Sequence, residues 1–212
     1  MFELKGVNVL RKGEALFPEV NLTLDAGQLE VVMGPSGCGK SSLLAAIAGT
    51  LGRDFSVSGE ILLERRSICT LPIELRQVGL QFQDDLLFPH LDVTGNLLFA
   101  LAQGDRQKRL QQVQHALVCA GLEGFDKRDV ATLSGGQRAR ISLLRTLLAK
   151  PKLLLLDEPY SRLDQALRAS FRQFVIDQLD QYQTPALLVT HDIQDCPNER
   201  YYDLQRGEFV LC

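Results

Sequence analysis

The chain has 212 residues, a formal net charge of −3 and 45% hydrophobic residues. These values fit one large globular domain, and the acidic balance disfavours a broad basic surface for nucleic acid. Five scattered cysteines without CxxC spacing argue against a disulfide framework or a zinc site and fit a reducing cytoplasm. Apolar runs are shorter than the roughly 18 residues of a membrane span, and early charged residues disfavour a signal peptide.

Short apolar segments at the start of the chain predict strands. Residues 2–10 and 20–24 alternate or cluster apolar side chains, and residues 28–33 follow a turn as a further apolar run. Residues 59–63 and 77–82 are additional strand candidates, separated by a short predicted helix near Leu71 and Pro72. One sheet-rich core therefore accounts for the chain up to residue 83.

The segment after the strand at 28–33 reads GPSGCGKS and matches the phosphate-loop pattern GxxxxGK[ST]. Glycines allow positive φ, so that backbone N–H groups can point at phosphate oxygens. Lys40 is expected to reach the β- and γ-phosphates, and the Ser41 hydroxyl to bind Mg²⁺. The flanking strand and the predicted helix at 42–49 support nucleotide binding. The predicted nucleotide-binding residues here are Gly34, Pro35, Ser36, Gly37, Cys38, Gly39, Lys40, Ser41 and Ser42.

Strand signals nearly vanish between residues 92 and 150, where three helical patterns follow one another. Thr94 is expected to cap the first helix, and the second is expected to begin near Asp105 and end at Gly121. The third follows paired glycines, and its arginines are interpreted as a solvated face: Arg138, Arg140 and Arg145. The pattern predicts a helical subdomain at 84–150, inserted into a nucleotide-binding core of 1–83 and 151–212.

Sheet signals return at residues 153–156, where four leucines run into Asp157 and Glu158. An apolar run of this kind is typical of a strand buried on both faces. An amphipathic helix with its apolar positions between 167 and 179 and a strand at 186–189 follow, which predicts parallel pairing. A hairpin is expected at 202–211.

Two carboxylates at the end of a buried strand suit phosphoryl transfer. Asp157 can help to hold Mg²⁺, while Glu158 can orient or deprotonate a water. A charged pair that merely ends a strand is the structural alternative. His191 also follows a buried strand, at the edge where open α/β sheets bind ligands, and is expected to contact the γ-phosphate. His115 is interpreted as a surface residue, and no role is assigned to His90.

Residues 133–137 read LSGGQ and place paired glycines at a predicted helix start. Such a start can bind an anion through its N–H groups, or it can be an ordinary helix start with Ser134 as N-cap.

The order of these motifs makes the whole chain resemble the ATP-binding subunits of ABC transporters. The motifs are GPSGCGKS at 34–41, Gln83, LSGGQ at 133–137, LLLLDE at 153–158, SRLD at 161–164 and His191. Two longer segments are most similar to bacterial importer subunits: FQDDLLFPHL and LSGGQRARISLLRTLLAKPKLLLLDEP. The resemblance is to a short form without the C-terminal regulatory domain of some importers.

The resemblance implies an ATP-hydrolysing, head-to-tail homodimer. The phosphate loop of one subunit and the signature residues of the other enclose each ATP; the latter are Ser134, Gly135, Gly136 and Gln137. Glu158 polarises the attacking water, with Lys40, Gln83 and His191 in catalysis or γ-phosphate sensing. The implied Mg²⁺ site uses Ser41, Gln83 and Asp157. The implied partners are a transmembrane permease and, indirectly, a periplasmic solute-binding protein, at the cytoplasmic side of the inner membrane and without nucleic acid.

The expected fold is α/β: a P-loop NTPase core with a mainly parallel sheet, an antiparallel β part at the N-terminal side and an inserted α-helical subdomain. A permease is expected to dock in a groove lined by Phe82, Leu86, Leu87, Phe88 and Leu97. The alternative function is a soluble ABC-type ATPase with a mechanical role; LSGGQ and the paired carboxylates disfavour a metabolite kinase. The transported substrate is not encoded in these motifs.

Three positions depart from the family pattern. Leu10 and Arg11 stand where an aromatic side chain usually stacks on adenine, and Phe17 is the nearest aromatic residue. Arg162 replaces the commoner alanine of the SRLD segment, and Pro197 is expected to shorten the helix after His191.

Overall fold

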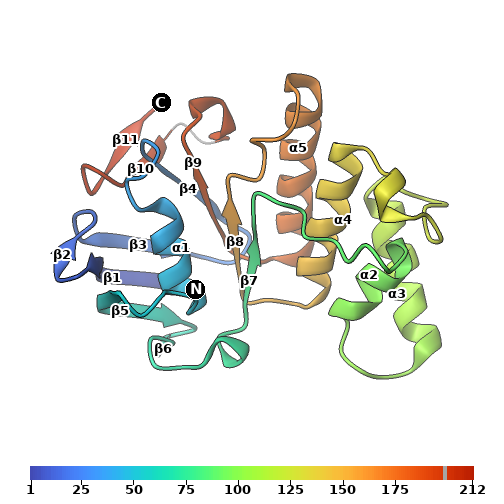
Figure 1. Ribbon diagram of the computed structural model, residues 1–212, viewed down its shortest axis with the longest axis horizontal. Helices are drawn as coiled ribbons and strands as arrows, with labels where there is room; N and C mark the ends of the chain where they lie inside the picture. The colour runs from blue at the N-terminus through green and yellow to red at the C-terminus, as the bar shows by residue number, and fades with distance from the viewer. Residues whose placement is uncertain (198–199) are drawn as a thin grey trace.

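The computed structural model describes residues 1–197 and 200–212. An antiparallel sheet occupies one side of the molecule, in the strand order β2-β1-β5-β6 with β3 also paired to β1 (Figure 1). Its strands are β1 (Phe2–Arg11), β2 (Glu14–Ala15), β3 (Val20–Leu24), β5 (Phe55–Leu63) and β6 (Arg66–Ser67). The antiparallel β part predicted from the start of the chain is therefore present.

The second sheet has the strand order β11-β10-β4-β9-β8-β7. All neighbouring strands in it are parallel except the β10–β11 pair, which forms the expected hairpin. Its strands are β4 (Leu29–Met33), β7 (Val78–Gln81), β8 (Leu153–Asp157), β9 (Ala186–Thr190), β10 (Arg200–Asp203) and β11 (Glu208–Leu211). Together with the helices described below, this sheet confirms the predicted fold class.

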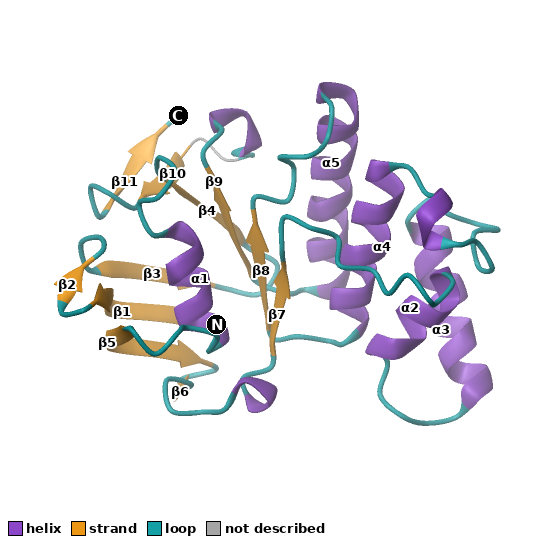
Figure 2. Cartoon of the chain, viewed as in Figure 1, coloured by secondary structure: helices purple, strands orange, loops and turns teal. Residues whose placement is uncertain are grey.

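The parallel sheet is buried on both faces because its central strands are apolar at every position. Successive side chains point to opposite faces. Leu153 and Leu155 pack toward the antiparallel sheet and α1 (Lys40–Ala48), while Leu154 and Leu156 pack toward α4 (Gly135–Leu148) and α5 (Gln165–Tyr182). Figure 2 shows these helices on the two sides of the strands. One sheet thus joins two cores.

Three helices form the segment inserted between β7 and β8: α2 (Val93–Ala100), α3 (Arg106–Cys119) and α4. Asp92, and not the expected Thr94, caps α2, because its carboxylate accepts a hydrogen bond from the Gly95 amide at 2.6 Å. Asp105 caps α3, which begins where expected. Buried residues of α3 belong to the same apolar cluster as β8, so the helices share a core with the sheet. The boundaries proposed for a separate subdomain remain a prediction.

The arginines of α4 are not a solvated face, so this interpretation was wrong. Arg145 donates to the carbonyls of Leu86 and Asp85, at 2.9 and 3.2 Å. Arg138 reaches the Asp85 carboxylate at 3.3 Å, and Arg140 donates to the Ala120 carbonyl at 2.7 Å. All three arginines are half-buried. They fasten α4 to the loop that follows β7 and to the end of α3.

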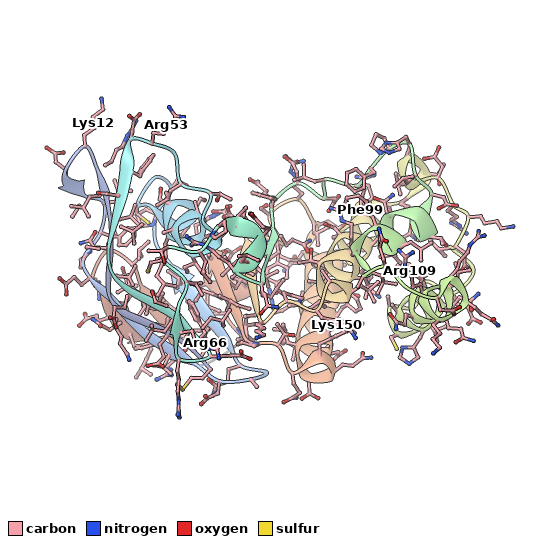
Figure 3. The ribbon with its side chains drawn as sticks, turned by 90° about the horizontal axis from the view of Figure 1, so that it is seen from below. Lys12, Arg53, Arg66, Phe99, Arg109 and Lys150 are labelled. Carbon is pink, nitrogen blue, oxygen red and sulfur yellow. The ribbon has the colours of Figure 1, made fainter. Side chains whose placement is uncertain are left out.

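Three short 3-10 segments complete the described elements: η1 (Ile73–Leu75), η2 (Val130–Thr132) and η3 (Ile193–Asp195). η1 begins after Pro72, as the sequence predicts. Between the end of β9 and residue 197, where the first described range ends, the only helical element is the turn η3, in agreement with the effect expected of Pro197. Figure 3 shows exposed Lys12 and Arg53 beside the antiparallel sheet and Phe99 on the helical side.

Candidate active site

The phosphate loop lies between the end of β4 at Met33 and the start of α1 at Lys40. Gly37 and Gly39 adopt φ values of +83° and +102°, which favour glycine. A Cβ on Gly34 would stand 2.6 Å from the Cys38 sulfur, so this position also needs glycine. The Lys40 ammonium donates to the Gly34 and Pro35 carbonyls, at 2.7 and 3.0 Å. The lysine therefore lies folded over its own loop.

Three parallel strands bring the predicted catalytic residues to the same edge of the sheet. In their register Met33 of β4 stands beside Thr190 of β9, and Asp157 of β8 stands beside Val189. Their carboxyl ends therefore meet. The Ser41 hydroxyl donates to the Asp157 carboxylate at 3.2 Å, across 116 residues of sequence. Ser42 continues α1, behind the loop.

Glu158 follows β8 in a left-handed conformation, with φ of +46°. This conformation costs free energy for a non-glycine residue, but it turns the chain so that two successive carboxylates approach one site. One Glu158 oxygen lies 4.0 Å from the Lys40 ammonium and 3.0 Å from Nδ1 of His191. Asp157, Glu158 and His191 thus face the phosphate loop together.

The pKa of Asp157 is raised above its ordinary value, chiefly by burial and further by neighbouring Glu158. The Ser41 hydroxyl and Lys40 act in the opposite direction. Oxygen donors from a hydroxyl and a carboxylate suit Mg²⁺, which usually takes its remaining ligands from phosphates and water. No group of three or more His, Cys, Asp or Glu that could hold a metal occurs among the described residues.

Gln83, the third predicted Mg²⁺ ligand, is exposed in the loop after β7. Within residues 1–197 and 200–212, no hydrogen bond joins its side chain to Ser41 or Asp157. Neighbouring Asp84 forms an ion pair with Arg162 of the SRLD segment. The unusual Arg162 therefore connects the loop after β7 with the segment after β8.

The segment that carries His191 is held by charged residues that the sequence patterns did not single out. Buried Asp195 accepts a hydrogen bond from the Thr190 hydroxyl at 2.8 Å and pairs with Arg172 at 3.4 Å. Asp192 pairs with Arg168 of α5. The pKa of Asp192 is lowered, first by the Gln194 amide and then by the Arg168 guanidinium. The two arginines, Arg168 and Arg172, lie 24 and 23 residues from Asp192 and Asp195 in the sequence, where no local pattern reveals them.

The LSGGQ segment begins α4 with a capping box. The Ser134 hydroxyl accepts from the Gln137 amide at 3.3 Å, and the Gln137 side chain accepts from the Ser134 amide at 2.9 Å. Gly136 is closely packed, since a Cβ added to it would stand 3.3 Å from the Leu167 side chain. Figure 1 shows α1 and α4 on opposite sides of the parallel sheet. A single chain therefore keeps the phosphate loop and the signature segment apart.

Phe17 does not offer a free face for adenine. Its side chain is 5% exposed, and its ring would lie 2.8 Å from a Cβ placed on Gly39. The guanidinium of Arg11 lies over the Phe55 ring, 5.7 Å from its centroid. Phe17 is thus core beneath the phosphate loop, so it does not fill the place of the missing aromatic residue.

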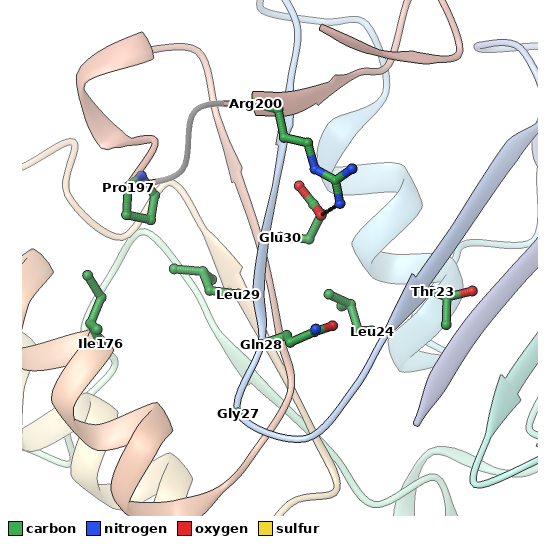
Figure 4. Close-up of a pocket in the computed structure, with 9 residues that line it drawn as sticks. All are labelled: Thr23, Leu24, Gly27, Gln28, Leu29, Glu30, Ile176, Pro197 and Arg200. Atoms are coloured by element: carbon green, nitrogen blue, oxygen red, sulfur yellow. Dashed lines mark ion pairs between the residues drawn. The ribbon is translucent and has the colours of Figure 1, made fainter. Parts of the chain in front are cut away.

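A pocket of about 540 Å³ lies away from this edge, beside the start of β4 (Figure 4). Glu30 lies in its wall, and its carboxylate is 3.5 Å from the Arg200 guanidinium. Burial raises the pKa of Glu30, while Arg200 opposes that shift. Because the phosphate loop follows the other end of β4, this pocket is not the candidate nucleotide site.

Comparison with known proteins identifies the family. Residues 17–161 match the family model of the ABC transporter. The ABC transporter ATP-binding protein YnjD of Escherichia coli K12 is 49% identical over 93% of this chain and 91% of its own length. The putrescine transport ATP-binding protein PotG of the same organism is 35% identical over 99% of this chain and 56% of its own. The chain thus spans about half the length of PotG.

Solved structures of known proteins agree with this family assignment. CbiO1 from Clostridium perfringens, part of the ABC transporter complex CbiONQ, superimposes with a TM-score of 0.86 at 25% identity, over 99% of this chain and 86% of its own. The ATP-binding cassette MJ0796, solved as a dimer bound to ADP and Pi after hydrolysis, gives 0.79 at 27% identity, over 100% and 98%. No helix among the described residues is long and apolar enough to cross a membrane. The chain belongs to the ABC transporter family, as an ATP-binding subunit that couples ATP hydrolysis to transport.

Proposed function

We propose that this ATPase powers an importer of a small solute, as a head-to-tail homodimer with Mg²⁺-ATP at each of two interfaces. The convergence of Lys40, Ser41, Asp157, Glu158 and His191 at one sheet edge carries the proposal for the chemistry. Import is supported by the names of relatives: PotG is a putrescine transport protein, and FbpC of E. coli K12, 36% identical, is an Fe(3+) ions import protein. Their different solutes leave the substrate of this chain open.

Each residue of the cluster has a role suited to its position. Lys40 leaves its loop carbonyls for the β- and γ-phosphates, whose charge it neutralises. Glu158 accepts a proton from the attacking water, and its contact with His191 at 3.0 Å orients the carboxylate. Ser41 and Asp157 would hold Mg²⁺, together with Gln83 after a movement of its loop, and the ion would offset the phosphate charge. His191 also contacts the γ-phosphate.

The separation of Ser134 from the phosphate loop supports the dimer. A helix start with paired glycines can bind a phosphate, but within one chain it lies across the sheet from Lys40. A second copy, placed head to tail, supplies Ser134, Gly135, Gly136 and Gln137 to the phosphate loop of the first. Each ATP is then enclosed by two chains.

Mixing two inactive variants tests this arrangement. Lys40→Ala disables the phosphate loop and Ser134→Arg disables the signature segment, so each homodimer has two defective sites. A mixed dimer has one site with both defects and one intact site. We expect the mixture to regain a substantial fraction of hydrolysis, measured as phosphate release, while each variant alone stays inactive. If the mixture stays inactive although both proteins are folded and nucleotide-dependent dimers form, the shared-site proposal is wrong.

We place the permease on an exposed apolar surface formed by Phe82, Leu86, Phe88 and Phe99. Phe82, Leu86 and Phe99 are 46%, 56% and 70% exposed, and the rings of Phe88 and Phe99 pack edge to face with centroids 4.7 Å apart. Leu97, which the sequence placed in the groove, is fully buried, so this assignment was wrong. Leu87 packs against the core. The surface suits a short amphipathic helix of a membrane subunit.

Phe99→Ser and a matched control test the docking. Val118→Ser changes a similarly exposed apolar side chain on α3, outside this surface. Both variants are expected to keep the wild-type melting temperature within a few degrees, since surface substitutions usually cost little. Only Phe99→Ser is expected to lose co-purification with the permease of the same gene cluster. Equal binding by both variants would rule the surface out, and if the wild type binds no permease, the soluble mechanical ATPase is favoured.

A further inference from the structure

Two thiols outside the active site lie close together. The sulfur atoms of Cys196 and Cys212 are 3.5 Å apart, although 16 residues separate them in the sequence. Cys196 follows η3, and Cys212 follows β11, whose last residue pairs with Arg200 of β10. Cys212 is exposed and Cys196 half-buried, so a small oxidant can reach the pair. The strand pairing therefore holds two nucleophilic groups side by side at the surface.

We propose that Cys196 and Cys212 form a reversible disulfide that slows ATP hydrolysis by displacing the segment of His191. Glutathione disulfide is a sufficient oxidant. The thiolate of Cys212 attacks one of its sulfurs and releases one glutathione; the thiolate of Cys196 then attacks the mixed disulfide and releases the second. The two protein thiols lose two electrons and two protons in total, and both glutathiones leave as thiols.

Contacts around η3 connect Cys196 to the catalytic edge. The Cys196 amide donates to the Ile193 carbonyl, and the Asp195 amide donates to Asp192, at 3.1 and 3.0 Å. The Asp195 side chain is buried against Thr190, the residue before His191. A short path of hydrogen bonds thus runs from Cys196 to the end of β9.

Bond formation requires movement, because a disulfide holds its sulfurs about 2.0 Å apart. If Cys196 moves toward Cys212, η3 is pulled with it and the 3.0 Å contact between His191 and Glu158 is disturbed. A misplacement of about 1 Å at a catalytic group can cost on the order of a hundredfold in rate. This step rests on the proposed role of Glu158 and His191, while formation of the disulfide does not.

The other cysteines occupy different surroundings. Cys69 accepts a hydrogen bond from the Ile61 amide at 3.4 Å, and Cys119 contacts His115 and Gln181. Cys38 lies in the phosphate loop, against Gly34. Among the described residues, no other two sulfurs are joined by a sulfur–sulfur contact as Cys196 and Cys212 are. Oxidation is therefore expected to select one pair.

The experiment equilibrates the purified wild-type chain in glutathione buffers of increasing oxidised fraction, without and then with excess reductant. We expect a loss of about 2 Da, a cross-linked peptide containing residues 196 and 212, and a tenfold to hundredfold fall in phosphate release that reductant reverses. The affinity for ATP, measured separately by titration, is expected to stay within about twofold of that of the reduced protein, because neither cysteine lies in the phosphate loop.

Cys212→Ser is the matched control, since it changes one exposed atom and keeps Cys38. We expect it to hydrolyse ATP at the wild-type rate when reduced and to resist the oxidant. Inhibition of this variant by the oxidant would assign the effect to Cys38 or another thiol and overturn the proposal. Absence of the 196–212 cross-link, or a cross-link that leaves hydrolysis unchanged, would also overturn it. A Glu158→Gln chain that still forms the cross-link shows that disulfide formation does not depend on catalysis.

Discussion

The carboxyl edge of the parallel sheet and the start of α4 differ in how complete they are. At the sheet edge, groups from α1, β8 and the segment after β9 already contact one another: Ser41 with Asp157 and Glu158 with His191. At the start of α4, the side chains of Ser134 and Gln137 instead form a capping box with each other's amides. The first site is assembled within one chain. The second is a stable helix start that lies across the sheet from the phosphate loop of its own chain.

This difference separates binding from hydrolysis. A single chain has the loop, the lysine and the carboxylates that a nucleotide needs, so we expect the monomer to bind ATP. In the proposed head-to-tail dimer, the charge that develops during phosphoryl transfer is stabilised by further donors at the start of α4, which lies on the far side of the sheet. Hydrolysis is therefore expected to depend on protein concentration more steeply than binding does.

Glu158→Gln should give the largest effect. It removes the proposed general base but keeps the shape of the side chain, so hydrolysis is expected to fall by about 10²–10⁴ while ATP binding stays. The nucleotide-bound dimer should then accumulate and elute earlier from a sizing column when ATP is added. Glu123→Gln, a change at an exposed carboxylate, is the control. An unchanged turnover rate in Glu158→Gln would remove Glu158 from the mechanism.

Lys40→Ala should weaken the site that the single chain already contains. A hydrogen bond to a charged group contributes about 1.5–3 kcal/mol, so we expect the dissociation constant for ATP to rise by roughly 10–100-fold. Titration of the monomer measures this directly, with exposed Lys127→Ala as the control. If Lys40→Ala binds ATP normally and only hydrolyses it slowly, the lysine acts in the transition state alone.

The base of the nucleotide should matter less than its phosphates. Phe17 is buried under Gly39, and Arg11 lies over Phe55, so the face expected for adenine lacks a free aromatic ring in the described residues near it. We expect GTP to compete with ATP with a dissociation constant within about tenfold. Phe17→Ala is expected to lower the free energy of unfolding by about 3–5 kcal/mol and to leave base selectivity unchanged. Strong preference for ATP would show that another group reads the base.

Local sequence patterns were sufficient to predict the strands, the phosphate loop and the sheet edge at which the carboxylates and His191 meet. The apolar run of β8 predicted burial on both faces, and parallel pairing then placed its end beside that of β9. The positive φ of Glu158 could not be foreseen, although the next residue, Pro159, favours an end to the strand at this point.

Three interpretations failed where contacts that the sequence patterns do not reveal decide the outcome. Arg145 has no helical neighbour that reveals its role, because its acceptors at Asp85 and Leu86 lie about 60 residues earlier. Thr94 and Asp92 are both acceptable caps locally, and the hydrogen bond to the Gly95 amide decides for Asp92. Leu97 looked like groove lining by position, but packing among the helices buries it.

Removal of a helix cap gives the smallest effect and the closest comparison of two helix starts. Ser134 caps α4 and Asp105 caps α3, each by accepting from the amide three residues later. Ser134→Ala and Asp105→Ala should therefore each lower the free energy of unfolding by about 1 kcal/mol, measured by urea denaturation. If α4 also completes the site of a second chain, only Ser134→Ala should lower hydrolysis at saturating ATP, with monomer binding of ATP unchanged. Equal hydrolysis by the two variants at matched stability would mean that the Ser134 hydroxyl caps its helix and does nothing more.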